Sequence, residues 1–117
     1  MNICSYVLSV FMTPVSDDER VVPLADLFRL LGDPTRLRIV LACVQDRLAV
    51  GAIADALSLS SSLVSHHLRL LRAARIVRAE REGKQVFYAA ADAHISAMIA
   101  GMLEHVAEPS AQWQEGA

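Results

Sequence analysis

Apolar residues recur at helical spacing through the first half of the chain. Between Pro23 and Leu31, leucines and one phenylalanine fall on a single helix face, and a second apolar stripe begins after the segment GDPT. In that segment Gly32 can close the first helix, Asp33 is a typical N-cap residue, and Pro34 suits the first helical position. The pattern predicts two successive amphipathic helices joined by a short turn.

A short apolar helix and a longer amphipathic helix follow, separated by the sequence SLS. We expect the short helix over about residues 50–57 and the longer one from Ser61, with Ser60 as its N-cap. The longer helix has an inward apolar stripe and an outward face of hydroxyl, histidine and arginine side chains. The outward residues are Ser61, Ser62, Ser65, His66, Arg69 and Arg72. This arrangement is typical of a helix-turn-helix.

The next segment, IVRAEREGKQVFYAA, changes from helical spacing to a β-prone alternation. Its two halves are separated by a turn near Glu82 and Gly83, which predicts a β-hairpin. A hairpin directly after a recognition helix is the wing of a winged helix. A last helix is expected over about residues 92–107, and Pro109 ends it. The predicted fold is mainly α with a small β-hairpin, a winged helix-turn-helix.

Length and composition fit one soluble domain. The chain has 117 residues, of which 54% are hydrophobic and 5% aromatic, a balance that favours helices. We expect residues 21–108 to form a DNA-binding and dimerisation domain, with a flexible or partly disordered extension at 1–20 and a disordered tail at 109–117. A domain of this size buries a limited share of its surface, so a partner chain would add stability.

The amino-terminal stretch MNICSYVLSVFM is apolar, but it has no basic leader and is too short to span a bilayer. Met12 is an alternative start. Cys4 and Cys43 match no disulfide framework or CxxC spacing, which fits a reducing compartment. We therefore expect a cytoplasmic protein without a membrane partner, with Cys43 as a buried thiol.

Basic residues are concentrated in one segment of an otherwise acidic chain. Residues 61–84 hold six basic and two acidic side chains, within a protein of net charge -2. Such a segment favours a local polyanion-binding face, although a solvated charged surface or a protein-docking module gives the same pattern. For duplex DNA, the base edges or adjacent phosphates would be contacted by Ser61, Ser62, Ser65 and His66. The phosphates would be neutralised by Arg69, Arg72, Arg78, Arg81 and Lys84.

The last predicted helix, DAHISAMIAGMLEHVAE, carries potential metal ligands at both ends. His94 and His105 are eleven residues apart, about 16 Å along a helix, so they cannot bind one zinc ion within the same chain. Asp92 with His94, and His105 with Glu108, form two half-sites. Two such helices packed antiparallel in a homodimer would bring these together into two interchain four-ligand sites.

Small residues near Ala100 and Gly101 would let the two helices approach. Two nitrogens and two carboxylates suit zinc, and cobalt or nickel would want more ligands. The alternative interpretation makes Asp92 an N-cap, the two histidines ordinary partly buried residues, and Glu108 a solvent-facing side chain.

The segments LGDPTRLRIV, SSSLVSHHLRLLRAARIVRAEREGKQVFYA and DAHISAMIAGMLEHVAE together resemble the ArsR/SmtB family of dimeric winged-helix metal-sensing repressors. The likeness covers about residues 24–108. The pattern Asp-x-His, ten residues, His-x-x-Glu is similar to that of the zinc-sensing subgroup, whose metal lies between the carboxy-terminal helices. The resemblance implies a homodimer formed through the first and last helices.

The resemblance also implies how the protein would act. A metal-free dimer would bind operator DNA ahead of metal efflux or sequestration genes, and zinc would release it. The family's hydrogen bond from the ligand matching His105 to a backbone carbonyl would fall on Arg75, giving that residue an allosteric role. The cysteine pair by which some relatives bind soft metals is absent, because Ala49 and Gly51 stand in its region.

Three other interpretations remain open from the residues alone. The same fold would sense cobalt or nickel instead of zinc, or would sense redox state or reactive sulfur through Cys4 and Cys43. A zinc hydrolase is disfavoured, because four protein ligands leave no open coordination position and no separate general base is near. We therefore expect a non-enzymatic protein with no small organic substrate.

Overall fold

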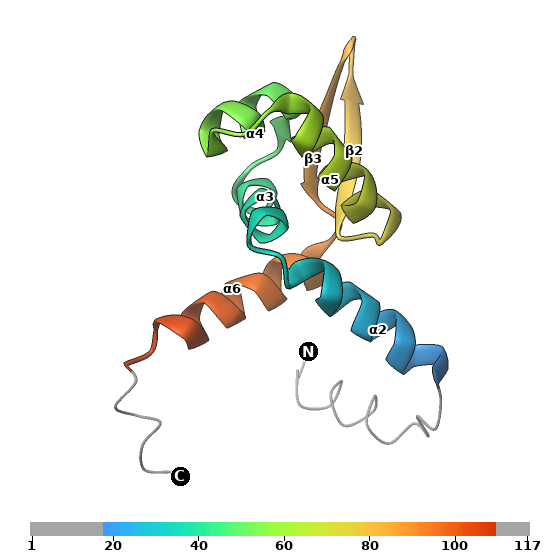
Figure 1. Cartoon of the computed structure of the whole chain (residues 1–117), viewed down its shortest axis with the longest axis vertical. Coiled ribbons are helices and arrows are strands. Elements are labelled where there is room, and N and C mark those ends of the chain that lie inside the picture. The colour runs from blue at the N-terminus through green and yellow to red at the C-terminus, as the bar shows by residue number, and fades with distance from the viewer. Residues whose placement is uncertain (1–17, 110–117) are drawn as a thin grey trace.

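The computed structural model describes residues 18–109, which form five helices and a small sheet. In chain order the elements are α2 (Asp18–Leu31), α3 (Pro34–Gln45), β1 (Leu48–Ala49), α4 (Val50–Leu57), α5 (Ser61–Ala73), β2 (Val77–Glu82), β3 (Gln85–Ala90) and α6 (Ala93–Ala107). Figure 1 shows α3, α4, α5 and the strands gathered into one head, with α2 and α6 extending below it. This architecture confirms the predicted winged helix-turn-helix.

Local capping explains where the central helices begin and end. The Asp33 side chain accepts the Arg36 N–H at 2.9 Å at the start of α3, and the Ser60 hydroxyl accepts the Leu63 N–H at 3.1 Å at the start of α5. Ser58 ends α4 in the left-handed conformation, with φ of 57°. The core that these helices share is made of fully buried aliphatic side chains. Its largest members are Ile39, Val40, Ile53, Val64, Leu68, Leu71, Ile76 and Val77.

The sheet is antiparallel, with strand order β1-β3-β2. The hairpin pairs Val77 with Ala90 at its base and Glu82 with Gln85 at its tip, where Gly83 adopts a positive φ of 64°. A two-residue loop that starts on such a glycine is a favoured hairpin connection. The third strand, β1, was not predicted, because two residues are too few to show an alternating pattern.

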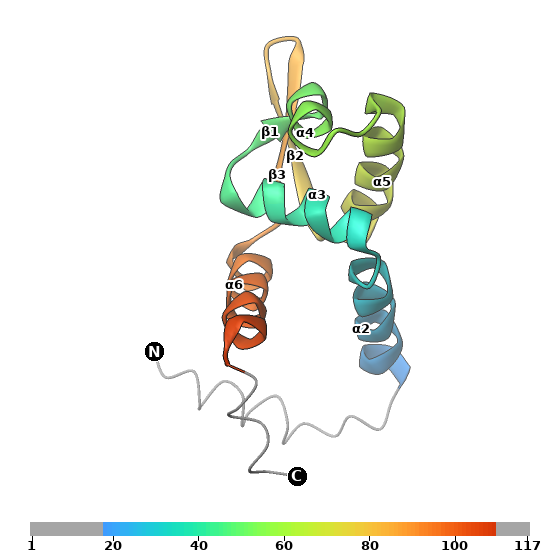
Figure 2. The ribbon, with the colours of Figure 1, turned by 60° about the vertical axis from the view of Figure 1, so that its left-hand side comes forward.

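Helices α2 and α6 both lie below α3, on the side of the molecule away from the tip of the hairpin (Figure 2). Both expose large apolar side chains: Phe28 of α2 is 52% exposed, while Met102 and Val106 of α6 are 54% and 79% exposed. No helix within residues 18–109 is long and apolar enough to cross a membrane. The two projecting helices therefore present an apolar surface that no other element within residues 18–109 covers.

The first helix is longer than the sequence pattern predicted. It begins at Asp18, and Pro23 lies inside it rather than at its start. This early proline removes one backbone hydrogen bond near the amino-terminal end, and acidic Glu19 in the first turn suits the positive end of the helix dipole. The predicted extension at 1–20 and tail at 109–117 lie almost wholly outside the described residues.

Candidate metal centre and nucleic-acid interface

The outward face of α5 carries the predicted polar residues. Val64, Leu68 and Leu71 are buried against the core, which turns the opposite helix face to the solvent. Ser61, Ser62, His66, Arg69 and Arg72 are exposed, and Ser65 is half-buried. Ser65, Arg69 and Arg72 also line a hollow that Tyr88 of β3 closes on the other side. The α5 face is thus continuous with the hairpin.

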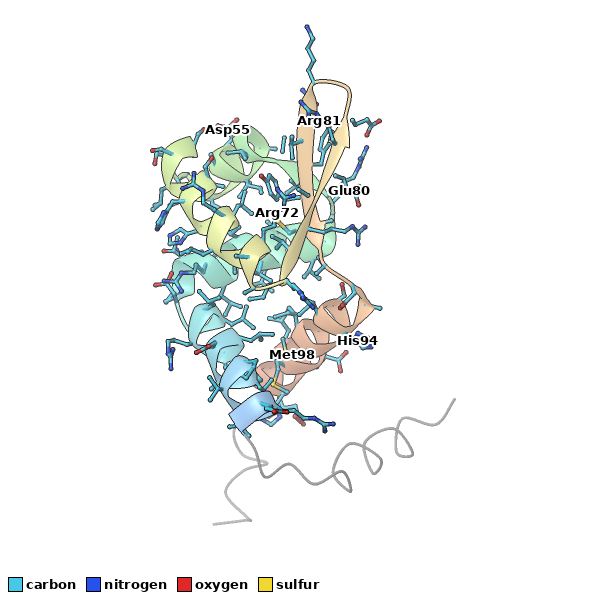
Figure 3. The ribbon with its side chains drawn as sticks, turned by 90° about the vertical axis from the view of Figure 1, so that its right-hand side faces the viewer. Asp55, Arg72, Glu80, Arg81, His94 and Met98 are labelled. Carbon is cyan, nitrogen blue, oxygen red and sulfur yellow. The ribbon has the colours of Figure 1, made fainter. Side chains whose placement is uncertain are left out.

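The three basic residues predicted on the hairpin have different surroundings. Arg81 and Lys84 are exposed near its tip, where Figure 3 shows Arg81. Arg78 lies at the base, where one guanidinium nitrogen donates to the Ala90 carbonyl at 2.9 Å and another lies 2.6 Å from a Glu80 carboxylate oxygen. The structure therefore leaves Arg81 and Lys84 open to an external anion, whereas Arg78 is already engaged within the chain.

The four residues predicted as metal ligands lie in two close pairs. At the start of α6, the His94 Nδ1 atom lies 3.6 Å from a carboxylate oxygen of Asp92. At its end, the His105 Nδ1 atom lies 3.4 Å from a carboxylate oxygen of Glu108. All four residues are exposed, and His94, seen in Figure 3, has 86% of its side chain accessible.

The spacing within each pair fits a tetrahedral zinc shell. Two ligand atoms that are each about 2.0–2.1 Å from zinc lie about 3.3 Å apart, close to the 3.4 Å and 3.6 Å of the two pairs. Between residues 18 and 109, no three His, Cys, Asp or Glu side chains of one chain gather into a possible metal site. Each chain therefore offers two pairs of donors, and neither pair alone completes a four-ligand site.

Asp92 also has a structural task. It is the N-cap of α6, and its carboxylate accepts the Ile95 N–H at 3.1 Å. This backbone hydrogen bond is the main reason that the Asp92 pKa is lowered, with nearby His94 adding to the effect. The carboxylate is thus held as an anion beside His94, which is the form that binds a metal cation.

Arg75 occupies a special backbone position between α5 and the hairpin. Its φ of 62° is left-handed, and its N–H donates to the Arg72 carbonyl at 3.0 Å. The following N–H, of Ile76, bonds the Leu71 carbonyl at 2.9 Å. These bonds close the carboxyl end of α5 and fix the direction in which the hairpin leaves it.

Cys43 is buried in α3, with 2% of its surface exposed. Burial raises its pKa to about 11, so the thiol is neutral at physiological pH. Thiolates, rather than thiols, are the reactive species. Cys4, the other residue of the redox hypothesis, lies outside the described part of the chain.

Two features were not among the predicted site residues. Arg47, just before β1, pairs with Glu80 and Glu82 of the hairpin and stacks on Phe87, its guanidinium carbon 4.4 Å from the ring centre. His67 of α5 has a buried Nδ1 atom without a hydrogen-bond partner, and burial, with help from nearby Arg36, lowers its pKa. Both depend on contacts between segments far apart in the chain, which local spacing does not encode.

Comparison with known proteins agrees with this architecture. The sequence model described as "Bacterial regulatory protein, arsR family" matches residues 33–79. The regulator CmtR of Mycobacterium tuberculosis is 42% identical over 83 residues, which cover 71% of this chain and 70% of the relative. The chain belongs to the arsR family of bacterial regulatory proteins. This membership confirms the prediction of a non-enzymatic protein.

Other arsR-family relatives extend the comparison. A transcriptional repressor SmtB homolog of Synechocystis is 39% identical over 85 residues, covering 73% of this chain and 64% of the relative. The chain thus spans a little under two thirds of that protein's length. The matched arsR-family region, residues 33–79, ends before α6, which carries the candidate ligands.

Solved structures share the fold. The cadmium metal-sensor CmtR of M. tuberculosis superposes with a TM-score of 0.63 at 42% identity, covering 71% of this chain and 86% of the other. The homodimeric winged helix-turn-helix DNA-binding domain of a possible ArsR-family regulator from Mycobacterium bovis gives a TM-score of 0.70 at 28% identity. There the coverage is 83% of this chain and 91% of the other.

Proposed function

We propose that this arsR-family protein is a cytoplasmic transcriptional repressor whose homodimer binds operator DNA and loses affinity for it when zinc binds. The genes it controls would serve metal efflux or sequestration. The observation that carries the proposal is the pair of half-sites on α6, each with the donor spacing of one edge of a zinc tetrahedron. Neither is complete in one chain.

The exposed apolar faces of α2 and α6 support a dimer. Side chains such as Phe28, Met102 and Val106 are half or more exposed in the single chain, and burying such surface is the main driving force of association. A Cβ placed on Gly101 of α6 meets no atom within 4 Å in the single chain, so space for a crossing helix exists there. An antiparallel pair of α6 helices would join each Asp92–His94 pair to the partner's His105–Glu108 pair.

The α5 face and the wing tip support DNA binding. Exposed serines on the first turn of α5 suit base edges or adjacent phosphates, and Arg69, Arg72, Arg81 and Lys84 suit phosphate neutralisation. Each phosphate contact contributes about 0.9 to the slope of log affinity against log salt. Replacing Arg81 with glutamine should therefore weaken binding at all sequences and reduce that slope by about one unit.

Zinc, when bound, supplies a centre that holds four donors from two chains together. The chain's part is to orient the donors: the Ile95 N–H holds the Asp92 carboxylate, and the His105 Nδ1 atom lies 3.4 Å from Glu108. The carbonyl of Arg75, held by the left-handed turn after α5, is the candidate acceptor of a hydrogen bond from His105. That bond would link the metal site to α5. Metal and DNA would then compete through a coupling of about 1–3 kcal/mol.

The test begins with duplex DNA selected from a random-sequence library by the metal-free, full-length protein. Fluorescence anisotropy then gives the affinity for the selected duplex with chelator, zinc, cobalt or nickel. We expect zinc to lower the affinity about 5- to 150-fold, and His105→Gln to abolish that effect while binding the duplex normally. Failure to select any duplex contradicts DNA binding, and an affinity unchanged at saturating zinc contradicts the metal response.

The redox hypothesis is tested with the same duplex. A variant with Cys4 and Cys43 both replaced by serine should respond to zinc as the natural protein does. The burial of Cys43 and its raised pKa give the physical reason. Loss of the response in this variant, together with a response to oxidant in the natural protein, would favour the redox interpretation.

A further inference from the structure

The guanidinium of Arg78 in β2 crosses the base of the hairpin to Ala90, the last residue of β3, and reaches Ala91, the first residue after that strand. One nitrogen donates to the Ala90 carbonyl at 2.9 Å and lies 3.4 Å from the Ala91 carbonyl, while Nε donates to Glu80 at 2.8 Å. These contacts use donors on both edges of the planar group, so the side chain is fixed in direction. Arg78 therefore points toward the start of α6 and not toward the tip of the hairpin.

The segment that Arg78 contacts is very short and ends on a candidate ligand. Only Ala91 and Asp92 separate the end of β3 from the start of α6. The Ala91 N–H donates to the Ile76 carbonyl at 3.0 Å, and the Ala91 carbonyl lies 3.4 Å from the Arg78 guanidinium, so both backbone groups of Ala91 are held. This double attachment fixes the backbone of Ala91, directly before Asp92, whose carboxylate accepts the Ile95 N–H at 3.1 Å.

A chain of charged groups continues from Arg78 along the hairpin. Glu80, which Arg78 contacts, also lies 3.4 Å from an Arg47 nitrogen, and Arg47 in turn pairs with Glu82 and stacks on Phe87. The hydrogen bond from Arg78 is the main reason that the Glu80 pKa is lowered. A displacement at the start of α6 would therefore act on a connected set of side chains that extends to Glu82, the last residue of β2.

We propose that Arg78 is a positioning residue that fixes the Asp92–His94 pair to the base of the wing and transmits occupation of that pair to the wing. The inference rests on the proposed function for its metal and DNA, but its structural part does not. This role of Arg78 would take the place of the phosphate contact that the sequence predicted for it. A residue with this role affects coupling between metal and DNA more than it affects either affinity alone.

The first experiment needs neither metal nor DNA. Hydrogen–deuterium exchange is measured in chelator on the natural full-length protein, on Arg78→Gln, and on the matched control Arg81→Gln, which removes the same charge near the tip. We expect about tenfold faster exchange of amides 90–95 in Arg78→Gln alone, because a charge-assisted hydrogen bond to that segment is lost. Unchanged exchange there overturns the inference, whatever zinc does.

The second experiment separates coupling from contact. Anisotropy with the selected duplex gives the ratio of DNA affinities without and with zinc, and its salt dependence counts phosphate contacts. Arg78→Gln should bring the ratio toward one and leave the metal-free salt slope unchanged, whereas Arg81→Gln should lower the slope by about one and keep the ratio. Arg78→Lys, which retains a donor for the carbonyls, should restore part of the ratio.

The outcomes distinguish the two proposals. A natural protein whose DNA affinity ignores zinc contradicts the proposed function, and the exchange experiment still decides whether Arg78 holds the half-site. A natural protein that responds to zinc, with an Arg78→Gln variant that keeps the full ratio and loses salt slope, overturns the inference and restores Arg78 as a phosphate contact.

Discussion

Asp92 is expected to have two separable roles, as the N-cap of α6 and as a metal ligand. The cap is the hydrogen bond from the Ile95 N–H to its carboxylate, 3.1 Å long. Serine at this position can also accept that bond, whereas alanine cannot. Asp92→Ser therefore removes the ligand and keeps the cap, and Asp92→Ala removes both.

The magnitudes follow from these two roles. Loss of an N-cap raises the unfolding equilibrium constant about fivefold, so in chelator Asp92→Ala should be less stable than Asp92→Ser by about that factor. Loss of an outer partner of a zinc ligand already weakens metal binding about 10- to 100-fold. Loss of a ligand itself should reach at least the upper end, and both variants should show it equally.

Asp33 provides the matched control, because it caps α3 through a 2.9 Å bond from the Arg36 N–H and belongs to neither half-site. Asp33→Ala should lose stability as Asp92→Ala does, and should bind zinc normally. Urea unfolding at one fixed protomer concentration gives the stabilities, since the stability of a dimer depends on concentration. Competition with a chromophoric chelator gives zinc affinity. Normal zinc binding by Asp92→Ser would refute Asp92 as a ligand, and equal stabilities of the two Asp92 variants would refute the cap argument.

Three further predictions concern other parts of the molecule. Because burial lowers the pKa of His67 in the folded protein, the unfolded chain binds more protons just below pH 6.5, so stability should fall as pH drops through that value. In urea titrations, His67→Gln should weaken this pH dependence; an unaltered dependence in that variant contradicts the assignment. At both Gly101 and Gly51 a Cβ meets no atom within 4 Å in the single chain, so a side chain at either position should not unfold it. Gly101→Leu should nevertheless convert the proposed dimer to monomers in analytical ultracentrifugation, whereas Gly51→Ala on α4 should not. A stable Gly101→Leu dimer would exclude the proposed crossing. Arg75→Gly should raise the unfolding midpoint, because glycine adopts the positive φ without strain, and should keep the zinc response, which depends on a backbone carbonyl; a lost response would show that the Arg75 side chain is needed.

The sequence was most informative where structure is determined locally. Asp33 and Ser60 cap α3 and α5 as predicted, and Gly83 opens the hairpin loop. Capping and tight turns involve residues three or four apart, so composition and spacing are enough to predict them. The donor pairs at each end of α6 belong to the same class, since Asp92 with His94 and His105 with Glu108 are close in sequence.

Features that depend on contacts between residues far apart in the chain could not be predicted from the sequence. Strand β1 exists because Leu48 and Ala49 pair with residues of β3 about forty positions later, and two residues carry no period. The direction of Arg78 depends on carbonyls twelve and thirteen positions away. A pattern of exposed arginines gives their number and sign but not which of them a neighbouring carboxylate and carbonyl will hold.

The two donor pairs lie at opposite ends of α6, and this placement explains why dimerisation, metal binding and DNA binding would be linked in this protein. Each proposed site takes two donors from each chain, so dimer formation and zinc binding must strengthen each other by the same factor. The amino-terminal donor pair directly follows the wing, at whose base Arg78 contacts the Ala90 and Ala91 carbonyls, and the carboxy-terminal pair belongs to the projecting end of the helix. A metal ion that joins the two pairs would fix the projecting end of one chain against the wing base of the other. The relative orientation of the two α5 helices would then depend on how the α6 helices cross, and a two-fold DNA site binds only a dimer whose α5 helices are oriented to match its half-sites.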